Sequence, residues 1–374
     1  MSTLLEVTML PAKEGDCLLI TYGHISDKKY ILIDGGRKWT YKNSLKVLFE
    51  KLKINQLELI VVTHVDRDHI EGIMTLFEDS KLHINVKDVW FNTYDHLKGR
   101  AINPPANDEG SFLEPMGAKM GEDLSDLLIK KGWPWNNYFK GNPVEITENM
   151  NDNKINIGEV KLTLLSPNRE KLKSFIPKWK AECRKAGIVA GIEAEEYGSY
   201  PISQFETMGS NRRIDIDKLA ETPFENDETD ANGSSIAFLF ELEDKRILFA
   251  GDAHADILKN SLENYKGTKS EKIILNAFKV SHHGSAHNIS NDILDMIECD
   301  HFLISTNGNY FKHPDPIAVA RIIKYGGEGK TLHFNFKTEF TEVWDRELWK
   351  KKYHYKTSFP RVDEDGKNTL TLSE

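Results

Sequence analysis

The sequence predicts an α/β fold in which two β-rich halves face each other. Short apolar runs alternate with amphipathic helical patterns over the first ninety residues, and the same rhythm returns after residue 232. The segments 29–35 and 246–252 resemble each other, because each is a strand pattern that ends in an acidic residue beside glycine. A length of 374 residues allows one large domain or two. We expect a single domain over residues 1–374.

The first half of the chain is punctuated as strand, turn, strand, turn, helix and strand. An amphipathic helix is expected where Leu45, Leu48, Phe49 and Leu52 recur at helical spacing. A second helical stretch is expected at 72–78. The strands are expected at 4–10, 17–22, 30–33, 57–62 and 86–91.

Residues 95–232 differ in composition from the two halves that flank them. They contain the Trp133-Pro134-Trp135 cluster, an acidic segment at 221–230 and one expected strand at 160–165. We interpret this range as an inserted elaboration, and residues 337–374 as a C-terminal extension. After the insertion, strands are expected at 235–241, 246–250, 273–280, 301–305 and 331–336, and helices at 255–264, 290–299 and 317–325.

Composition excludes several classes of protein. Apolar residues make up 39% and charged residues 29%, which is typical of a globular chain, and the net charge of −9 gives no general attraction to nucleic acid. The 3 cysteines lack CxxC spacing, so a disulfide framework and a thiolate zinc cage are not expected. No apolar run reaches membrane-spanning length and no signal peptide is evident, so we expect a cytoplasmic protein without membrane partners.

The segment from Thr63 to Glu71 concentrates potential metal ligands. His64, Asp66, Asp68 and His69 directly follow the apolar run 57–62, so they lie at the end of an expected buried strand. If the backbone stays extended, the side chains at 64, 66 and 68 project to one side. Two imidazoles and two carboxylates favour a divalent metal. A calcium loop is not expected, because Ile70 occupies the third acidic position.

Three later features also follow expected strands. Asp252 stands in the sequence Gly251-Asp252, then come the paired residues His282 and His283, and finally His313 before proline. Loops at strand ends meet in space if those ends share one edge of the sheets. We therefore expect one site assembled from four separate loops.

These motifs resemble those of the metallo-β-lactamase-fold hydrolases. The order Thr-His-x-Asp-x-Asp-His, Gly-Asp, His-His-Gly-Ser and His-Pro is similar above all to the soluble metallo-hydrolase domain of bacterial competence (DNA-uptake) proteins. The resemblance covers about residues 5–92 and 232–336, and residues 14–17, 31–36 and 232–235 also match it. It implies an αββα sandwich, with two mixed sheets packed face to face and helices outside. The insertion has no counterpart in it and is expected near the active face.

The resemblance also implies two divalent ions per chain, zinc or manganese. His64 and Asp66 would bind the first ion and Asp68 and His69 the second, with Asp252 bridging them. One of His282 and His283, preferably His283, would complete the second ion. Asp34 and Asn232 would support the ligands by hydrogen bonds. The zinc enzymes of the family usually carry histidine where this chain has Asp66, so manganese becomes a competitor to zinc.

The implied activity is hydrolysis by a hydroxide that bridges the two metals. Phosphoesters or phosphodiesters, including nucleotides or nucleic acid, suit such a site best. Asp68 or a metal-free histidine would shuttle a proton, and His313 would orient the phosphate or protonate the leaving group. Hydrolysis of a carboxylic ester, lactone or amide is one alternative, and a metal-stabilised regulatory subunit without activity is another. The sequence carries no signal of oligomeric state.

Two further features admit opposite interpretations. The basic segment 171–185, with Lys178, Lys180 and Arg184, is either a nucleic-acid surface or a solvated helix face, and Pro177 should break or kink a helix there. Trp133 and Trp135 could each stack on a base or pack within the insertion. Neither feature decides the substrate.

Overall fold

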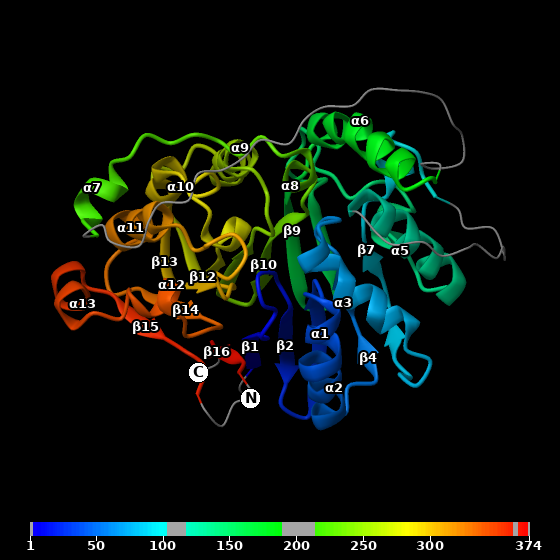
Figure 1. Cartoon of the computed structure of the whole chain (residues 1–374), viewed down its shortest axis with the longest axis horizontal. Coiled ribbons are helices and arrows are strands. Elements are labelled where there is room, and N and C mark those ends of the chain that lie inside the picture. The colour runs from blue at the N-terminus through cyan, green and yellow to red at the C-terminus, as the bar shows by residue number, and fades with distance from the viewer. Residues whose placement is uncertain (1–2, 103–116, 189–213, 362–365, 373–374) are drawn as a thin grey trace.

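The computed structural model describes residues 3–102, 117–188, 214–361 and 366–372. Parts of the expected insertion, at 103–116 and 189–213, lie outside the described residues. Helices cover the outer faces of two β-sheets, and the two ends of the chain lie side by side at the bottom of Figure 1. Among the described helices, none combines the length and the apolar character that crossing a membrane requires.

The first sheet has 6 strands in the order β16-β1-β2-β3-β5-β7. Its first part is antiparallel, whereas β3, β5 and β7 run parallel, so the sheet is mixed. The short strands β4 and β6, which directly precede β5 and β7 in the chain, form a separate parallel pair. The bounds are β1 Thr3–Met9, β2 Leu18–His24, β3 Asp27–Ile33, β4 Gln56–Leu57, β5 Leu59–Val61, β6 Asn85–Val86, β7 Val89–Trp90 and β16 Asn368–Thr371.

The second sheet has 8 strands in the order β15-β14-β13-β12-β11-β10-β9-β8. The strands from β8 to β11 are antiparallel, and those from β11 to β15 are parallel. The bounds are β8 Lys154–Ile157, β9 Val160–Ser166, β10 Ala237–Leu242, β11 Lys245–Phe249, β12 Ile273–Lys279, β13 Ile297–Ile304, β14 Thr331–Phe334 and β15 Lys356–Ser358.

Helices form the two outer layers. The first sheet is covered by α1 Lys38–Thr40, a π-helical turn Tyr41–Leu45, α2 Lys46–Leu52, α3 Arg67–Glu78, α4 Tyr94–Leu97, α5 Gly117–Lys131 and α6 Arg169–Lys185. The second is covered by α7 Ile216–Ala220, α9 Ala255–Lys266, α10 Asn291–Met296 and α11 Pro316–Tyr325. Shorter helical segments are Asn137–Phe139, α8 Asp230–Gly233, Ser281–Gly284, α12 Glu339–Glu342 and α13 Glu347–Tyr353.

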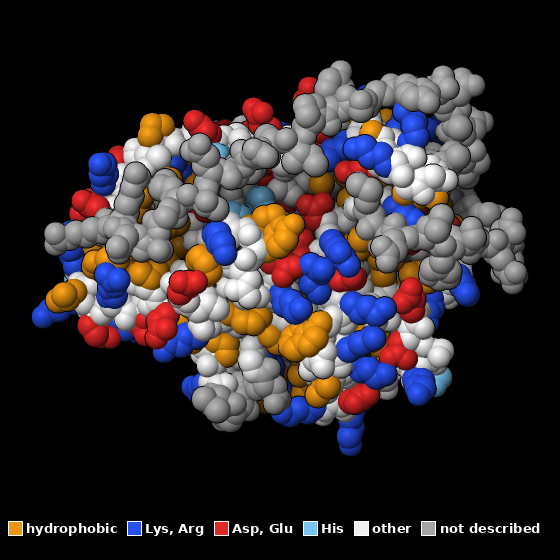
Figure 2. All heavy atoms as spheres, in the orientation of Figure 1, with side chains coloured by type: hydrophobic (Ala, Val, Ile, Leu, Met, Phe, Trp, Pro, Cys, Tyr) orange, Lys and Arg blue, Asp and Glu red, His pale blue; other side chains and the backbone are white. Residues whose placement is uncertain are grey.

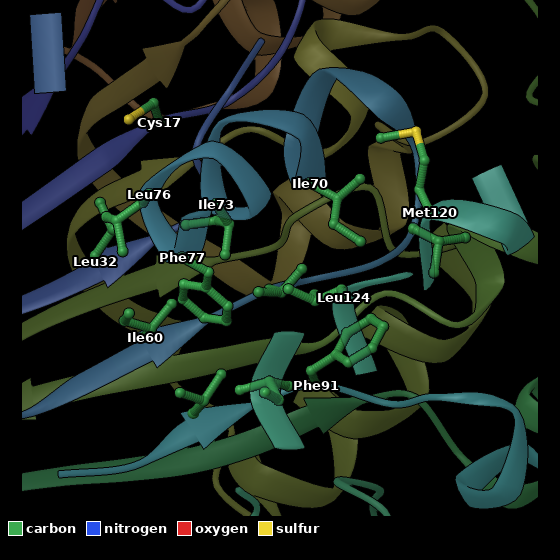
Figure 3. Packing of buried hydrophobic residues seen from close by; sticks show 14 of the residues in the cluster. Cys17, Leu32, Ile60, Ile70, Ile73, Leu76, Phe77, Phe91, Met120 and Leu124 are labelled. Atoms are coloured by element: carbon green, nitrogen blue, oxygen red, sulfur yellow. The ribbon is translucent and has the colours of Figure 1, made fainter. Parts of the chain in front are cut away.

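Three separate apolar clusters establish the order of the layers. Side chains alternate along each strand, so Ile31 and Ile33 of β3 face the second sheet while Leu32 between them faces the helices. Figure 3 shows Ile73 and Phe77 of α3 packed in this helix-side cluster. A second helix-side cluster covers the other sheet. The predicted αββα sandwich, with two mixed sheets face to face and helices outside, is confirmed.

Several boundaries differ from those expected. The helix predicted at 290–299 ends at Met296, because the following residues pair with β12 as the start of β13. The predicted break at Pro177 is wrong, since α6 continues through it and buries Phe175 and Trp179 against α4 and α5. Residues 154–166, inside the range expected as an insertion, form β8 and β9 of the second sheet. The C-terminal extension supplies β16, which pairs with β1.

The two tryptophans of the middle region pack against the rest of the protein. Trp133 meets Phe77 edge to face, with ring centroids 4.8 Å apart. Trp135 stacks on Phe91 and donates its indole N–H to the Phe91 carbonyl at 2.9 Å. These contacts favour the packing interpretation over base stacking.

The start of α3 is held by backbone contact with the turn after β3. The Gly35 amide donates to the His69 carbonyl and the Gly72 amide to the Gly36 carbonyl, both at 2.8 Å. A Cβ atom on Gly72 would lie 1.9 Å from the Gly35 carbonyl oxygen. Only glycine permits this approach, which fixes the position of the metal-ligand loop before α3.

Gly72→Ala should therefore destabilise the protein. The added methyl group meets rigid backbone, so we expect the free energy of unfolding to fall by about 1–3 kcal/mol in urea denaturation. Glu78→Ala, an exposed change on the same helix, should stay within about 0.5 kcal/mol of the parent. Equal stability of the two variants would contradict the proposed close packing.

Candidate metal centre

The carboxylate of Asp252 lies at the centre of a group of histidines. Asp252 follows β11 and is 2% exposed. Its Oδ2 atom lies near the Nε2 atoms of four imidazoles from two segments: His64 and His69 follow β5, and His282 and His283 follow β12. The distances are 3.4 Å to His69, 3.6 Å to His283, 3.7 Å to His64 and 3.8 Å to His282.

Two of these imidazoles are fixed by strong acceptors at Nδ1. His69 donates from Nδ1 to Oδ2 of Asp34 at 2.8 Å, and His283 donates to the Ser305 carbonyl at 2.9 Å. An acceptor at Nδ1 places the proton there and leaves a lone pair on Nε2 of the neutral ring. Both lone pairs then point toward Asp252.

His64 is oriented through Thr63. The Thr63 hydroxyl donates to Oδ2 of Asp34 at 2.7 Å, so it can accept from Nδ1 of His64 at 3.0 Å. The Thr63 amide donates to the other carboxylate oxygen of Asp34 at 2.8 Å. Asp34 therefore orients both histidines of the motif, in the supporting position expected of it.

His282 is held by a separate polar network. Its Nδ1 lies 3.1 Å from Oδ1 of Asn288 and 3.4 Å from Oδ2 of Asp227. Asp227 also accepts from Nδ2 of Asn232 at 2.7 Å and from the Thr229 hydroxyl at 2.6 Å. Asn232 thus supports His282 through Asp227, and its own Nδ2 lies 3.2 Å from the same ring nitrogen.

The turn that carries the paired histidines has an unusual backbone. His282 and His283 have φ angles of 46° and 54°, the left-handed region that non-glycine residues seldom adopt. The turn is joined to the Asp252 loop, because the His282 amide donates to the Gly251 carbonyl at 3.0 Å. Ser281 also donates to the Ala253 carbonyl at 2.7 Å. Held in this conformation, both rings face Asp252.

The donor set fits divalent metal ions. The Nε2 atoms of His69 and His283 are 3.2 Å apart, and two facing lone pairs repel unless a cation or a proton lies between them. Within the described part of the chain, Nε2 of His64 and Oδ1 of Asp252 are buried without a hydrogen-bond partner. Four overlapping groups of the described residues have metal-binding spacing, and two of them lie within the predicted ligand set: His64, His69 and Asp252, and Asp68, His69 and His283. The other two contain Asp16, once with Asp252 and His283 and once with Asp34 and His69.

The two remaining carboxylates of the motif lie on different sides of this centre. Oδ2 of Asp68 is 3.5 Å from Nε2 of His283 and 3.9 Å from that of His69. Oδ2 of Asp66 is 3.6 Å from Nε2 of His64, and its side chain is 44% exposed. The structure therefore places Asp66 beside His64 and Asp68 beside His69, in the pairs expected from the sequence.

His313 contacts His282 on the outer side of the group of histidines around Asp252. Its ring centroid is 5.3 Å from that of His282, and its Nδ1 is 3.5 Å from Oδ1 of Asp315. Burial, partly opposed by Asp315, keeps the pKa of His313 below its ordinary value. Figure 2 shows histidine and acidic side chains in the hollow at the middle of the face in view.

Sequence reasoning missed Asp16 and Lys279. They form an ion pair of 2.6 Å in which each side chain is 1% exposed. Oδ1 of Asp16 lies 3.5 Å from Nδ1 of His283, and Asp16 shares a group of metal-binding spacing with Asp252 and His283. The pattern Gly15-Asp16 matches Gly251-Asp252 and could have indicated it.

Asp227, Asn288 and Ser305 were also not identified from the sequence. Asp227 lies in the acidic segment 221–230, which has no distinguishing local pattern. Asn288 contributes a side-chain oxygen and Ser305 a backbone carbonyl. A backbone carbonyl leaves no residue-type signal, so only the fold reveals it.

Charges in the centre shift one another's pKa. Burial alone would raise the pKa of Asp252, but His69, His283 and His282 hold it well below its ordinary value. Burial alone would lower the pKa of His283, yet Asp252 and Asp16 raise it to about 10. In the metal-free protein, positive charge is therefore favoured where the imidazole nitrogens converge.

Asp227→Asn should weaken metal binding. The amide keeps the shape of the side chain but removes the negative charge and opposes the Nδ2 donor of Asn232 with another donor, so His282 loses its orientation. We expect metal affinity to fall by about 10- to 100-fold in competition with a chelator. Glu228→Gln, an exposed neighbour, is the matched control. Unchanged affinity in a folded Asp227→Asn protein would contradict this role.

No protein-family model matches the sequence, and no curated protein matches it. Several solved structures are similar. YhfI from Bacillus subtilis, a metallo-beta-lactamase fold protein, aligns over 98% of this chain and 99% of its own, with 10% identity and a TM-score of 0.43. CmlA, a diiron beta-hydroxylase from Streptomyces venezuelae, aligns over 99% of this chain with 12% identity and a TM-score of 0.41.

A diphosphatase of the PhnP family aligns over 99% of both chains, with 11% identity and a TM-score of 0.35. The chain spans 54% of the length of CmlA. With TM-scores below 0.5, these likenesses carry no conclusion about activity. What the protein can do follows from the geometry of its own residues.

Proposed function

We propose that this protein is a hydrolase that uses two divalent metal ions, and that its substrate is a phosphoester, most suitably a phosphodiester. The observation that carries the proposal is the convergence of four histidine Nε2 atoms on Oδ2 of Asp252 at 3.4–3.8 Å. Asp66 and Asp68 add oxygen donors on either side. Such a mixed set of nitrogen and oxygen ligands suits zinc or manganese.

We infer the same division of ligands between two ions that the sequence predicts. His64 and Asp66 would hold one ion, and Asp68, His69 and His283 the other. Asp252 would bridge them, because its Oδ2 lies near histidines of both groups. His283 supports the preference made from the sequence, since it shares a metal-binding group with Asp68 and His69. His282 also faces Asp252 and is available to either ion.

When bound, two such ions supply an activated water and neutralise negative charge on the reacting group. The chain's own residues hold and orient the reactants. Asp68 is the carboxylate nearest to the paired Nε2 atoms and could accept a proton. His313, neutral near pH 7 because its pKa is lowered, could hydrogen-bond an ester oxygen or a leaving group.

The choice of a phosphoester over a carboxylic ester rests on Asp66. A carboxylate in this position makes the centre harder and richer in oxygen, which favours manganese. Two hard ions suit a phosphoester because negative charge develops on both the entering and the leaving oxygen. That the substrate is a nucleic acid stays a prediction. The similarity to the competence proteins also stays a prediction. Part of the basic segment is already engaged, because Lys171 lies 3.0 Å from Asp256 and 2.9 Å from Nδ1 of His254.

Asp252→Asn should abolish phosphodiester hydrolysis. The amide removes the charge that both ions share, so we expect turnover of bis-p-nitrophenyl phosphate to fall by about a thousandfold or more, along with bound metal. Asp244→Asn, whose side chain is 77% exposed in the turn after β10, is the matched control and should behave as the parent.

Three outcomes separate the candidate functions. Loss of turnover in folded Asp252→Asn supports the proposal. Much faster turnover of carboxylic esters or lactones by the parent would favour the alternative hydrolase. Two bound ions per chain with no turnover of either substrate class would favour a regulatory subunit.

Asp66→His should change the preferred metal. The substitution replaces a hard oxygen ligand by imidazole, so the ratio of bound zinc to manganese should rise by about tenfold when both are supplied. Elemental analysis after dialysis against equal concentrations measures this ratio. Asp244→His controls for an added surface histidine, and the same ratio in both variants would show that Asp66 is not a ligand.

A further inference from the structure

Two large aromatic side chains are exposed beside the metal centre. Tyr310 is 75% exposed and Phe311 is 49% exposed, both in the loop after β13 that also carries His313. Figure 2 shows hydrophobic side chains at the margin of the central hollow. Exposed aromatic rings next to a polar centre usually indicate a binding surface.

The loop itself is well ordered by hydrogen bonds. The Lys312 amide donates to the Gly308 carbonyl at 3.1 Å, which closes the turn that displays both rings. The Asn307 amide donates to the Lys13 carbonyl at 2.7 Å, and the Asp315 amide donates to the Gly284 carbonyl at 2.9 Å. Both ends of the loop are thus attached to other loops of the site, so the aromatic side chains are presented on a fixed backbone.

A continuous series of rings leads from the surface to the metal ligands. Tyr310 meets Phe311 edge to face at 4.7 Å. Phe311 stacks on His313 with ring centroids 6.0 Å apart and an interplanar angle of 23°. His313 in turn lies 5.3 Å from His282, whose Nε2 faces Asp252. Two imidazole rings, those of His313 and His282, therefore separate Phe311 from Asp252.

Positive charge accompanies these rings. Nζ of Lys312 lies 5.2 Å from the centre of the Phe340 ring, and Nζ of Lys13 lies 5.7 Å from that of Trp39. Trp39 is itself 45% exposed. Both lysines belong to the two loops joined by the Asn307 hydrogen bond, so cations are available beside the exposed rings for an anionic substrate.

We propose that Phe311 and Tyr310 determine specificity by stacking on a flat aromatic or heterocyclic ring of the substrate's ester group. The phosphoryl group would lie at the centre around Asp252, and the ring would lie against Phe311 at the rim. This inference rests on the proposed function, because it assigns the substrate class of the same site. A flat aromatic ring gains from both apolar burial and stacking on the Phe311 ring, whereas a saturated ring gains from apolar burial alone.

Binding of two matched phosphonates tests the inference. Phenylphosphonate and cyclohexylphosphonate have the same number of ring carbons and no ester bond to hydrolyse, but only the first ring is flat. We expect the manganese-loaded protein to bind phenylphosphonate about tenfold more tightly in isothermal titration calorimetry. Phe311→Ala should remove this preference, and Tyr310→Ala should reduce it.

Further variants distinguish stacking from simple apolar contact. Phe311→Trp should restore the preference for phenylphosphonate, whereas Phe311→Leu should not. Leu348→Ala, at another exposed apolar side chain (83% exposed, on α13), should leave both affinities unchanged. Equal affinity of the parent for the two phosphonates, or an equal loss for both in Phe311→Ala, would overturn the inference.

A kinetic measurement separates this inference from the proposed function. With bis-p-nitrophenyl phosphate, Phe311→Ala should raise KM by about tenfold and leave kcat within about twofold. If the parent hydrolyses phosphoesters but Phe311→Ala changes neither KM nor the phosphonate preference, the inference alone fails. If the parent hydrolyses none, yet its phosphonate preference depends on Phe311, the proposed hydrolysis fails and the stacking surface stands.

Discussion

The convergence of four imidazole Nε2 atoms on one buried carboxylate is the constraint on which the rest of this structure depends. Each ring is fixed by an acceptor at Nδ1: Asp34 for His69, Thr63 for His64, a backbone carbonyl for His283, and Asn288 with Asp227 for His282. Without those acceptors, the rings could turn their donor sides inward or rotate away. The supporting polar groups thus decide which chemistry faces the centre.

The sandwich provides these acceptors because loops of both sheets meet at one place. Asp34 and the His64–His69 segment follow β3 and β5 of the first sheet, whereas Asp252 and the paired histidines follow β11 and β12 of the second. The apolar cluster between the sheets brings the two sets together. The contact between Gly35 and Gly72 then fixes α3 and its ligands against the turn after β3. The packing of the apolar faces therefore also determines where the polar ligands lie.

The centre and its rim differ in physical character. The inner groups are buried, charged and mutually compensated, as the Asp16–Lys279 ion pair beneath His283 shows. Removing one partner of such a set leaves an uncompensated charge at low dielectric. The outer groups are partly exposed and chemically different from one another: the carboxylate of Asp66, the imidazole of His313 and the benzene ring of Phe311.

The sequence by itself determined much of this protein. Periodicity predicts most strands of both sheets, and short motifs indicate the candidate ligands His64, Asp66, Asp68, His69, Asp252, His282 and His283. Local patterns suffice for these, because strand ends and clustered ligands are visible in a few consecutive residues.

Only the tertiary structure decided which atoms meet. Asp227 and Asn288 have no local signal, and Ser305 acts through a carbonyl that every residue possesses. The continuous helix through Pro177 likewise depends on burial of Phe175 and Trp179, since tertiary packing offsets the hydrogen bond that proline cannot donate. Sequence patterns report what a residue can do, whereas contacts between distant segments decide what it does.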